Sequence, residues 1–187
     1  QHQHTPVNVL ESIVKLDNSL EALKAVSRNP AASAQILRQL VRHQINDGEM
    51  YRVFDKNVVT NPSAPADVLS LIYGRGDAFS RAAVIAHTNC PQSLLEQAVN
   101  DSEILVQRQV ARKCMQLVVL ARLAKSNDTA VRSGVAANMQ APRALVGHLL
   151  NDTANVVRRA IAIRSDLSAA SIKRLMHDTD HWVRLWI

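Results

Sequence analysis

The chain has 187 residues, of which 47% are hydrophobic but only 3% aromatic, and its formal net charge is +6. It contains no run of 18 apolar residues, so the sequence predicts no helical membrane span. Two cysteines and five glycines are too few for a disulfide scaffold, an iron–sulfur cluster or a glycine-rich phosphate loop. We therefore expect a cytoplasmic protein that uses no cofactor.

The sequence repeats itself about every 26 residues. A fixed period of this length is typical of a solenoid, in which each repeat packs only on its neighbours. The equivalent positions that mark the period are Pro6, Ser33, Pro65, Pro91, Leu117, Pro142 and Ser168. Seven repeats start near residues 2, 29, 61, 87, 113, 138 and 164, and we expect them to form a single domain over residues 1–187.

The first half of each repeat predicts a short α-helix. Apolar residues lie three, four and seven positions after the marker, as Val68, Leu69 and Ile72 do after Pro65. This spacing places them on one helix face, which must be buried. Pro is tolerated in the first turn, because the N–H that it lacks has no partner within the helix. In the fifth repeat the same spacing predicts that Leu120, Ala121 and Ala124 are the buried residues.

The second half of each repeat predicts another helix, which begins near a carboxylate. An acidic side chain at that place accepts hydrogen bonds from the free N–H groups of the first turn. These acidic residues are Asp77, Asp101, Asp128, Asp152 and Asp178. The predicted buried positions of this helix are all β-branched: Val26, Val58, Val84, Val110, Val135, Ile161 and Ile187. No useful stretch alternates with period two, so we expect no β-sheet.

The second repeat is longer than the others, with 32 residues between Ser33 and Pro65. We interpret the extra residues as a longer loop at 43–51, which includes Asn46-Asp47-Gly48. Because such a loop interrupts the stacking, limited proteolysis should cut there first. Initial cleavage within residues 91–165, with this loop intact, would contradict the interpretation.

The repeat unit Asn-Pro-x-x-Pro-x-x-Leu-Leu, followed by Asp and then Val-Arg-x-x-Val-Ala, resembles that of the leucine-rich repeat variant family. The best matches are residues 61–111 and 128–187. The resemblance implies a right-handed superhelix of paired short helices, related to HEAT repeats, in which the second helix is often 3₁₀ and no sheet occurs. Leu117 in place of Pro and Gln107 in place of Arg depart from the pattern. The cysteine cluster of one branch of the family is absent, so no redox chemistry is carried over.

Asp and Arg recur at fixed positions of the second half, and in stacked helical repeats such side chains form a ladder between consecutive repeats. We interpret these residues as such a structural ladder, with a binding role for the Arg column as the alternative. The ladder arginines are Arg81, Arg132, Arg158 and Arg184. Asp101, Asp152 and Asp178 each lie six residues before this repeat position, and Asp77 and Asp128 lie four residues before it.

Positive charge is concentrated in the C-terminal half. Residues 104–187 hold 13 Lys or Arg and five Asp or Glu, whereas residues 1–103 hold nine and 11. The surplus predicts a basic ridge off the ladder, in which Arg108 and Arg159 share one repeat position. The predicted partner-binding residues of this ridge are Arg108, Arg112, Lys113, Arg159 and Arg164. Such a ridge is suited to binding a polyanion such as nucleic acid, or an acidic protein. The alternative is that these residues form an ordinary solvated surface.

The remaining aromatic and histidine residues carry weaker signals. Trp182 and Trp186 lie four residues apart, either as part of the last core contact or as an exposed patch for a partner. His177 and His181 are separated by a predicted turn, so we predict no metal site there. His87 and His148 are interpreted as half-exposed polar residues.

Taken with the solenoid pattern, these features favour a non-catalytic scaffold that binds another protein. The alternative is binding of nucleic acid or another polyanion through the basic C-terminal half, although no aromatic residues interleave with the charges to stack on bases. A DNA glycosylase of the HEAT-like type ranks behind both, because its lesion-contacting aromatic and acidic residues have no counterpart that we can place. The oligomeric state is left open by the sequence.

Overall fold

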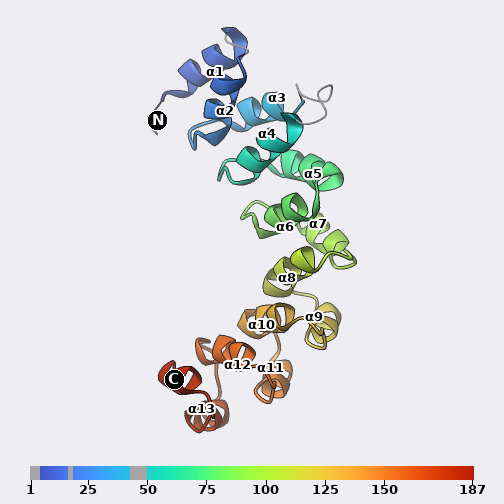
Figure 1. Ribbon diagram of the computed structural model, residues 1–187, viewed down its shortest axis with the longest axis vertical. Helices are drawn as coiled ribbons and strands as arrows, with labels where there is room; N and C mark the ends of the chain where they lie inside the picture. The colour runs from blue at the N-terminus through green and yellow to red at the C-terminus, as the bar shows by residue number, and fades with distance from the viewer. Residues whose placement is uncertain (1–4, 17–18, 43–49) are drawn as a thin grey trace. The chain divides into compact units, whose positions relative to one another are not determined.

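A computed structural model of the chain describes residues 5–16, 19–42 and 50–187 (Figure 1). These residues form fourteen α-helices and include no strand and no 3₁₀ segment. The predicted all-α repeat architecture without a sheet is therefore confirmed for the described part of the chain. The 3₁₀ second helix that the family resemblance allowed is not found there. The right-handed turn of the superhelix stays a prediction.

The chain divides into two compact parts, Gln1–Leu94 and Leu95–Ile187, and the boundary falls within α7 (Gln92–Ala98). The expectation that all seven repeats form one domain stays a prediction. The N-terminal part contains α1 (Val7–Leu16), α2 (Leu20–Arg28), α3 (Ala34–Arg42), α4 (Met50–Val59), α5 (Ala66–Arg75) and α6 (Ala78–Ala86). The C-terminal part contains α8 (Ile104–Lys113), α9 (Leu117–Leu123), α10 (Thr129–Ala137), α11 (Arg143–Leu149), α12 (Asn155–Ala162), α13 (Ala169–Met176) and α14 (His181–Leu185).

Odd-numbered helices are the first helices of the repeats and even-numbered helices are the second. In the N-terminal part, α4 packs against both α2 and α6, and α5 packs against α6. The loop predicted at residues 43–51 lies outside the described residues, except at its end. Residues 50 and 51 belong to α4, so the prediction that the loop includes them is wrong.

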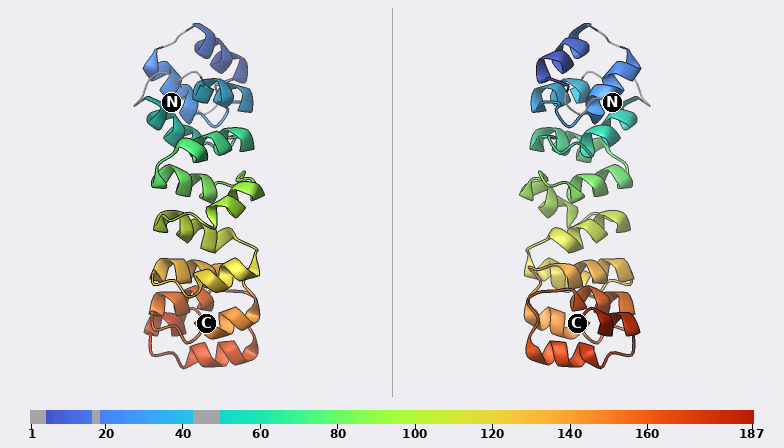
Figure 2. Two further views of the ribbon diagram at one scale, coloured as in Figure 1. Left: turned by 90° about the vertical axis from the view of Figure 1, so that its right-hand side faces the viewer. Right: turned by 90° about the vertical axis from the view of Figure 1, so that its left-hand side faces the viewer.

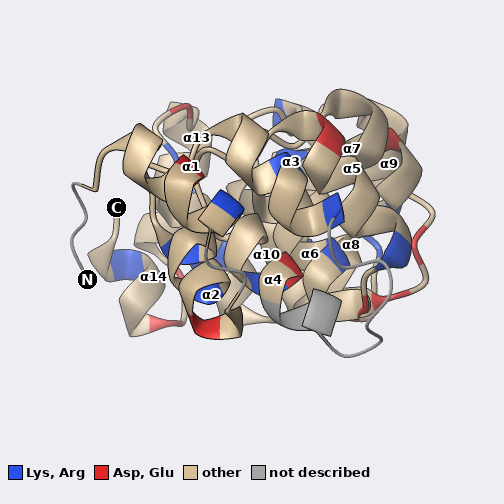
Figure 3. Cartoon of the chain, turned by 90° about the horizontal axis from the view of Figure 1, so that it is seen from above, with Lys and Arg blue, Asp and Glu red and all other residues tan. Residues whose placement is uncertain are grey.

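In the C-terminal part, the second helices form the more closely packed layer. There α10 packs against α8 and α12, and α12 packs against α14. The first helices α9, α11 and α13 form a row beside this layer (Figures 1 and 2), and each packs on the second helix of its own repeat. Figure 3, which looks down the long axis, separates α9 and α13 from α8, α10 and α14. The two layers therefore present two different faces.

The core of each part lies between its two layers. The β-branched positions predicted for the second helices are almost fully buried from Val26 to Ile161. The last member, Ile187, is 40% exposed, so its predicted burial is wrong. The cause is that α14 ends at Leu185, and Val183 provides the buried contact of this helix instead.

The first helix of the fifth repeat is shifted by one position relative to the prediction. Its N-cap is Gln116, so Leu117 is the first helical residue and is exposed, as is Ala121. The buried residues of the helix are Val119, Leu120 and Leu123, and Ala124 at its C-cap is buried as predicted. The turn from Cys114 to this N-cap is two residues shorter than the turn from Asn138 to the N-cap Pro142 of α11. A shorter turn moves the helix start, and the buried face moves with it.

The acidic residues before the second helices act in two ways. Asp77 and Asp128 are N-caps, and their carboxylates accept the N–H of Ser80 and Val131. Asp101, Asp152 and Asp178 instead lie two residues before the N-cap, and each accepts the N–H of that N-cap residue. This difference explains why the Asp-to-Arg spacing in the sequence is either four or six residues.

Polar side chains in the turns after the second helices join consecutive repeats. Asn138 donates from Nδ2 to the carbonyls of Ala111 and Cys114, at 2.9 and 2.8 Å, and its Oδ1 accepts the N–H of Gln140. Asn61 makes the equivalent bonds in the N-terminal part, to the carbonyls of Ser27 and Asn29. Each such residue therefore satisfies buried carbonyls at a helix end of the previous repeat.

His87 fills the same position as Asn138 and is buried, so the expectation that it is half-exposed is wrong. Its Nδ1 accepts the N–H of Asn89, and its Nε2 lies 3.0 Å from the carbonyl oxygen of Asn61. In this arrangement Nδ1 acts as an acceptor, because a backbone N–H can only donate, and Nε2 is placed to donate to the Asn61 carbonyl. Imidazole supplies the same acceptor and donor as the Asn amide, which explains the substitution.

Candidate binding surface of the C-terminal part

Two ladder arginines of the C-terminal part, Arg132 and Arg158, each bridge two repeats. Arg132 donates to both oxygens of Asp152, at 2.7 and 3.0 Å, and Arg158 binds Asp178 in the same way at 2.7 and 2.9 Å. In both pairs the Asp lies 20 residues after the Arg and opens the second helix of the next repeat. Arg158 also donates to the Asp152 carbonyl of its own turn. Both pairs are largely buried, which makes the ladder a structural element.

The ladder residues Arg184, Arg81 and Asp101 also form bonds within their own turns. Arg184 donates to the carbonyls of Asp178 and Thr179, which are the bonds within its own turn that the other ladder arginines make. In the N-terminal part, Arg81 donates to the carbonyl of Gly76. Asp101 accepts the N–H of Glu103 and thereby shapes the turn before α8.

The prediction that Arg108 lies off the ladder is wrong. Gln107, which occupies the ladder position, keeps only the bond within its own turn, to the Asp101 carbonyl. The neighbouring Arg108 reaches the carboxylate of the next repeat and binds Asp128 through two bonds, at 3.1 and 2.6 Å. The adjacent side chain therefore completes the contact that Gln107 cannot make.

The same prediction is wrong for Arg159, which forms a second bridge beside the Arg158–Asp178 pair. Arg159 donates to both oxygens of Asp180, at 2.9 and 2.7 Å, and Asn155 donates to the same carboxylate. Asp180 is also the N-cap of α14. Replacing Arg159 would therefore disturb the stacking of the last repeat as well as any surface charge.

Arg164 is buried, so it cannot belong to an exposed basic ridge as predicted. Its guanidinium donates to the carbonyls of Ala136 and Asn138 and to both oxygens of Asp166. In the turn after α12, Arg164 thus joins its repeat to the previous one, as Asn138 does in the turn after α10. Of the other ridge candidates, Arg112 is exposed and Lys113 is half-buried at the end of α8.

Every carboxylate in residues 104–187 is held by an arginine. The five pairs are Arg108–Asp128, Arg132–Asp152, Arg158–Asp178, Arg159–Asp180 and Arg164–Asp166. Because this segment holds 13 basic residues and five acidic ones, eight positive charges remain without a carboxylate from the segment. All residues of the segment are described, and the pairs account for all its acidic groups.

These pairs make the C-terminal part sensitive to acid. The paired arginine lowers the pKa of each of four carboxylates: Asp128, Asp166, Asp178 and Asp180. At Asp152 burial raises the pKa, but the bonds from Arg132 and a backbone N–H lower it by more, so the pKa of Asp152 is lowered as well. A lowered native pKa stabilises the fold fully at pH values above the unfolded-state pKa of about 3.9, and this stability is lost progressively as the pH falls from that value through the lowered native pKa.

We therefore expect the urea midpoint of the C-terminal part to drop between pH 5 and pH 3, as measured by the fluorescence of Trp182 and Trp186. These are the two tryptophans of the chain, and both lie in the last repeat. A midpoint that is the same at pH 7, 5 and 3 would show that the paired carboxylates do not stabilise the fold.

The first helices of the C-terminal part carry basic residues but no acidic ones. Arg122 lies on α9, Arg143 on α11, and Lys173 and Arg174 on α13, and all four are exposed. Arg122 is anchored to the Val99 carbonyl and to Asn100. Arg143, Lys173 and Arg174 have no carboxylate at ion-pair distance among the described residues. Net positive charge therefore lies on the first-helix side of this part.

Apolar side chains are exposed on the same side, at the starts of these helices. Leu117 and Val118 begin α9, and Val118 is 84% exposed. Met115 and Met139 lie in the preceding turns of two consecutive repeats, and both are about half exposed. The two turns are in contact, because Asn138 donates to the carbonyl of Cys114. We call the exposed side chains of this side the first-helix face: Met115, Leu117, Val118, Met139, Arg143, Lys173 and Arg174.

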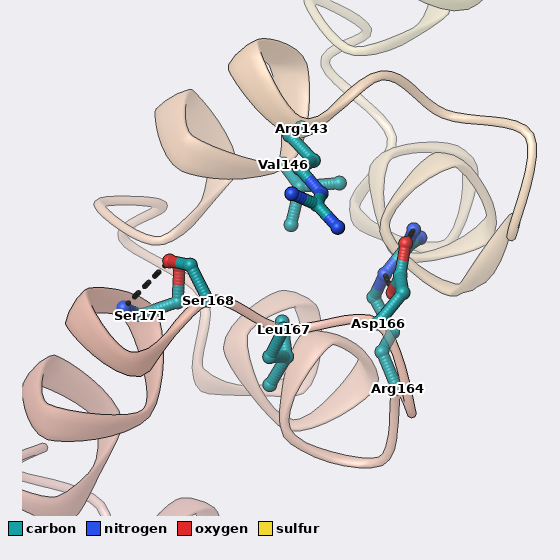
Figure 4. Close-up of a pocket in the computed structure, with 7 residues that line it drawn as sticks. All are labelled: Arg143, Val146, Arg164, Asp166, Leu167, Ser168 and Ser171. Carbon is teal, nitrogen blue, oxygen red and sulfur yellow. Dashed lines mark hydrogen bonds and ion pairs between the residues drawn. The ribbon is translucent and has the colours of Figure 1, made fainter.

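A small cavity of about 50 Å³ lies between the starts of α11 and α13. Arg143 extends into it from α11, and Ser168 and Ser171 line it from the start of α13 (Figure 4). The two serine hydroxyl oxygens are 2.9 Å apart. Arg164 and Asp166 line the opposite side as a neutralised pair, so Arg143 provides the net charge of the cavity. The cavity suits a small anionic group such as a carboxylate.

Trp182 and Trp186 lie on the other side of the C-terminal part, on the last second helix. They are 51% and 60% exposed, and the ring of Trp182 packs edge-on against His181, with 5.6 Å between ring centroids. They are therefore not buried in the core. Their predicted contact with a partner stays a prediction.

The described residues contain no group of three or more His, Cys, Asp or Glu side chains that could hold a metal ion. The Cys114 thiol is buried, and this burial raises its pKa, while Cys90 is half-buried. His177 is bonded through Nδ1 to the Lys173 carbonyl of its own helix. None of the described helices is long and apolar enough to cross a membrane.

No protein-family model and no curated protein matches this chain. Among solved structures, it is similar to "a leucine-rich repeat variant with a novel repetitive protein structural motif". The two sequences are 25% identical, the match covers 91% of this chain and 76% of the other, and the TM-score is 0.59. The resemblance to the leucine-rich repeat variant that the repeat unit predicted is thereby confirmed, and this chain is similar to that protein in both its repeat and its fold.

Proposed function

We propose that the chain is a non-catalytic scaffold that binds another protein through the first-helix face of its C-terminal part. The observation that supports this proposal is the pairing of all five carboxylates of residues 104–187 with arginines. This pairing leaves Arg143, Lys173 and Arg174 without a carboxylate at ion-pair distance among the described residues, and exposed apolar side chains lie on the same face. Unneutralised cations beside apolar groups are suited to association with a complementary surface.

A second candidate function is binding of nucleic acid or another polyanion, and the excess of basic over acidic residues in the segment 104–187 favours it. The apolar side chains distinguish the two. Val118 and Leu117 are exposed beside the basic residues, whereas a phosphate backbone gains nothing from aliphatic groups. Protein binding is therefore the better-supported function.

Capture of partners from an extract of the source organism tests the proposal. The full chain is immobilised, and the extract is applied with and without nuclease treatment. We expect a protein to be retained after nuclease treatment and, once purified, to bind the chain directly in calorimetry. Retention of nucleic acid alone, with affinity falling by about 0.9 log units per log unit of salt for each phosphate contacted, would replace the proposal with polyanion binding.

A matched pair of variants locates the binding. The double variant Arg143→Glu/Arg174→Glu reverses two exposed charges of the first-helix face, neither of which forms an ion pair. Arg112→Glu reverses an exposed charge on α8, in the other layer. We expect the double variant to lose the partner and Arg112→Glu to retain it. Equal binding by all three proteins would contradict the assignment of the first-helix face.

A further inference from the structure

The first-helix face is not uniform along the stack. At the start of α9 it is apolar, with Met115, Leu117 and Val118, and Met139 lies in the adjoining turn. At the start of α11 it becomes basic, with Arg143. At the start of α13 it contains the cavity lined by Ser168 and Ser171. Apolar and anion-attracting groups therefore follow one another from repeat to repeat.

From this order we infer that the partner contributes a short acidic segment with an apolar anchor, which runs along the helix starts from α9 to α13. The inference rests on the proposed function, because it specifies what kind of protein segment the same face accepts. The apolar side chain of the segment covers Leu117 and Val118. A carboxylate of the segment lies at the mouth of the cavity against Arg143.

Charge is the reason why the segment must be acidic. α9, α11 and α13 contain no Asp or Glu, and the one carboxylate lining the cavity, Asp166, is already held by two bonds from Arg164. The guanidinium of Arg143 offers paired N–H donors to a carboxylate. The hydroxyls of Ser168 and Ser171 are bonded to each other, which leaves one O–H donor of the pair for the carboxylate. Lys173 and Arg174 on α13 extend the positive charge beyond the cavity.

The spacing of the repeats sets the spacing within the segment. Equivalent helices of neighbouring repeats lie about 10 Å apart, and an extended chain advances about 3.3 Å per residue. An apolar residue over α9 and an acidic residue over the start of α11 are therefore about three residues apart in the segment. A stretch of about six residues reaches from α9 to α13 by the same estimate.

Selection from a displayed library of random 12-residue peptides tests this inference on the full chain. We expect the selected peptides to combine Leu, Met or Phe with Asp or Glu about three residues away. Synthetic copies should bind about tenfold or more weakly to Arg143→Glu and to Val118→Asp. They should bind Arg112→Glu as they bind the natural chain, because that residue lies on α8. Both Arg143 and Val118 are exposed, so an unchanged far-UV circular dichroism spectrum will confirm that the variants are folded.

The outcomes separate this inference from the proposed function. One outcome is that the chain retains a protein partner but selects either no peptides or only peptides without acidic residues. In that case the scaffold function stands, and the inference that the partner binds through an acidic segment is wrong. If peptides of the expected kind bind the Arg143→Glu variant equally well, the location is wrong. If the captured ligand is nucleic acid alone, both proposals fail together.

Discussion

Replacing Arg158 with Met is expected to lower the free energy of unfolding by on the order of 3 kcal/mol. The change leaves the Asp178 carboxylate without its two charge-assisted bonds in a site where its side chain is only 9% exposed. It also removes the donor to the Asp152 carbonyl. Because Asp178 opens the turn before α14, the last repeat should loosen first, and the fluorescence of Trp182 and Trp186 reports on that repeat during urea unfolding.

Two controls show whether this loss comes from the pair. Arg174→Met removes an exposed charge that has no ion pair, so its effect should stay within about 0.5 kcal/mol. The double variant Arg158→Met/Asp178→Leu removes both charges and should be more stable than Arg158→Met alone, because no uncompensated carboxylate stays buried. Equal stability of Arg158→Met and Arg174→Met would refute a stabilising ladder.

Replacing Asn138 with Ala is expected to have a comparable effect through hydrogen bonds rather than charge. The carbonyls of Ala111 and Cys114 lose their donor, and each buried acceptor left unsatisfied costs about 1–3 kcal/mol. Urea unfolding followed by far-UV circular dichroism measures the loss. Gln140→Ala changes an exposed side chain of the same turn and should be nearly neutral.

A second substitution at the same position separates hydrogen bonding from side-chain size. Asn138→Asp keeps the shape and the acceptor for the Gln140 N–H but loses the two donated bonds and introduces a buried charge. It should therefore be at least as destabilising as the alanine variant. A stable Asp variant would mean that water, and not Asn138, satisfies these carbonyls.

The fold was predictable because each repeat places equivalent residues in equivalent environments. The period of the sequence, the paired helices and the buried β-branched positions through Ile161 all follow from apolar spacing. The fifth repeat shows the limit of predicting helix positions from apolar spacing. The two-residue shortening of the turn after Cys114 shifts α9, and the apolar pattern fits both registers. Turn length, unlike a helix face, leaves no periodic signal in the sequence.

The candidate surface was only half predictable. The sequence located the charge excess in residues 104–187 but assigned it to Arg108, Arg159 and Arg164, all of which hold carboxylates in the structure. Repeat position does not reveal such pairs, because an Arg side chain is long enough to reach a carboxylate from a neighbouring position. One signal was present in the sequence nonetheless: the segments that became α9, α11 and α13 contain no acidic residue.

Hydrogen–deuterium exchange of the chain, alone and with the purified partner, tests most directly whether the first-helix face is the binding surface. We predict slower exchange in the complex at Met115–Leu123, at Met139–Leu149 and in α13, with little change in the second-helix layer of α8, α10, α12 and α14. Protection confined to that second-helix layer, for example around Trp182 and Trp186, would contradict the account and transfer the binding surface to the opposite side of the C-terminal part.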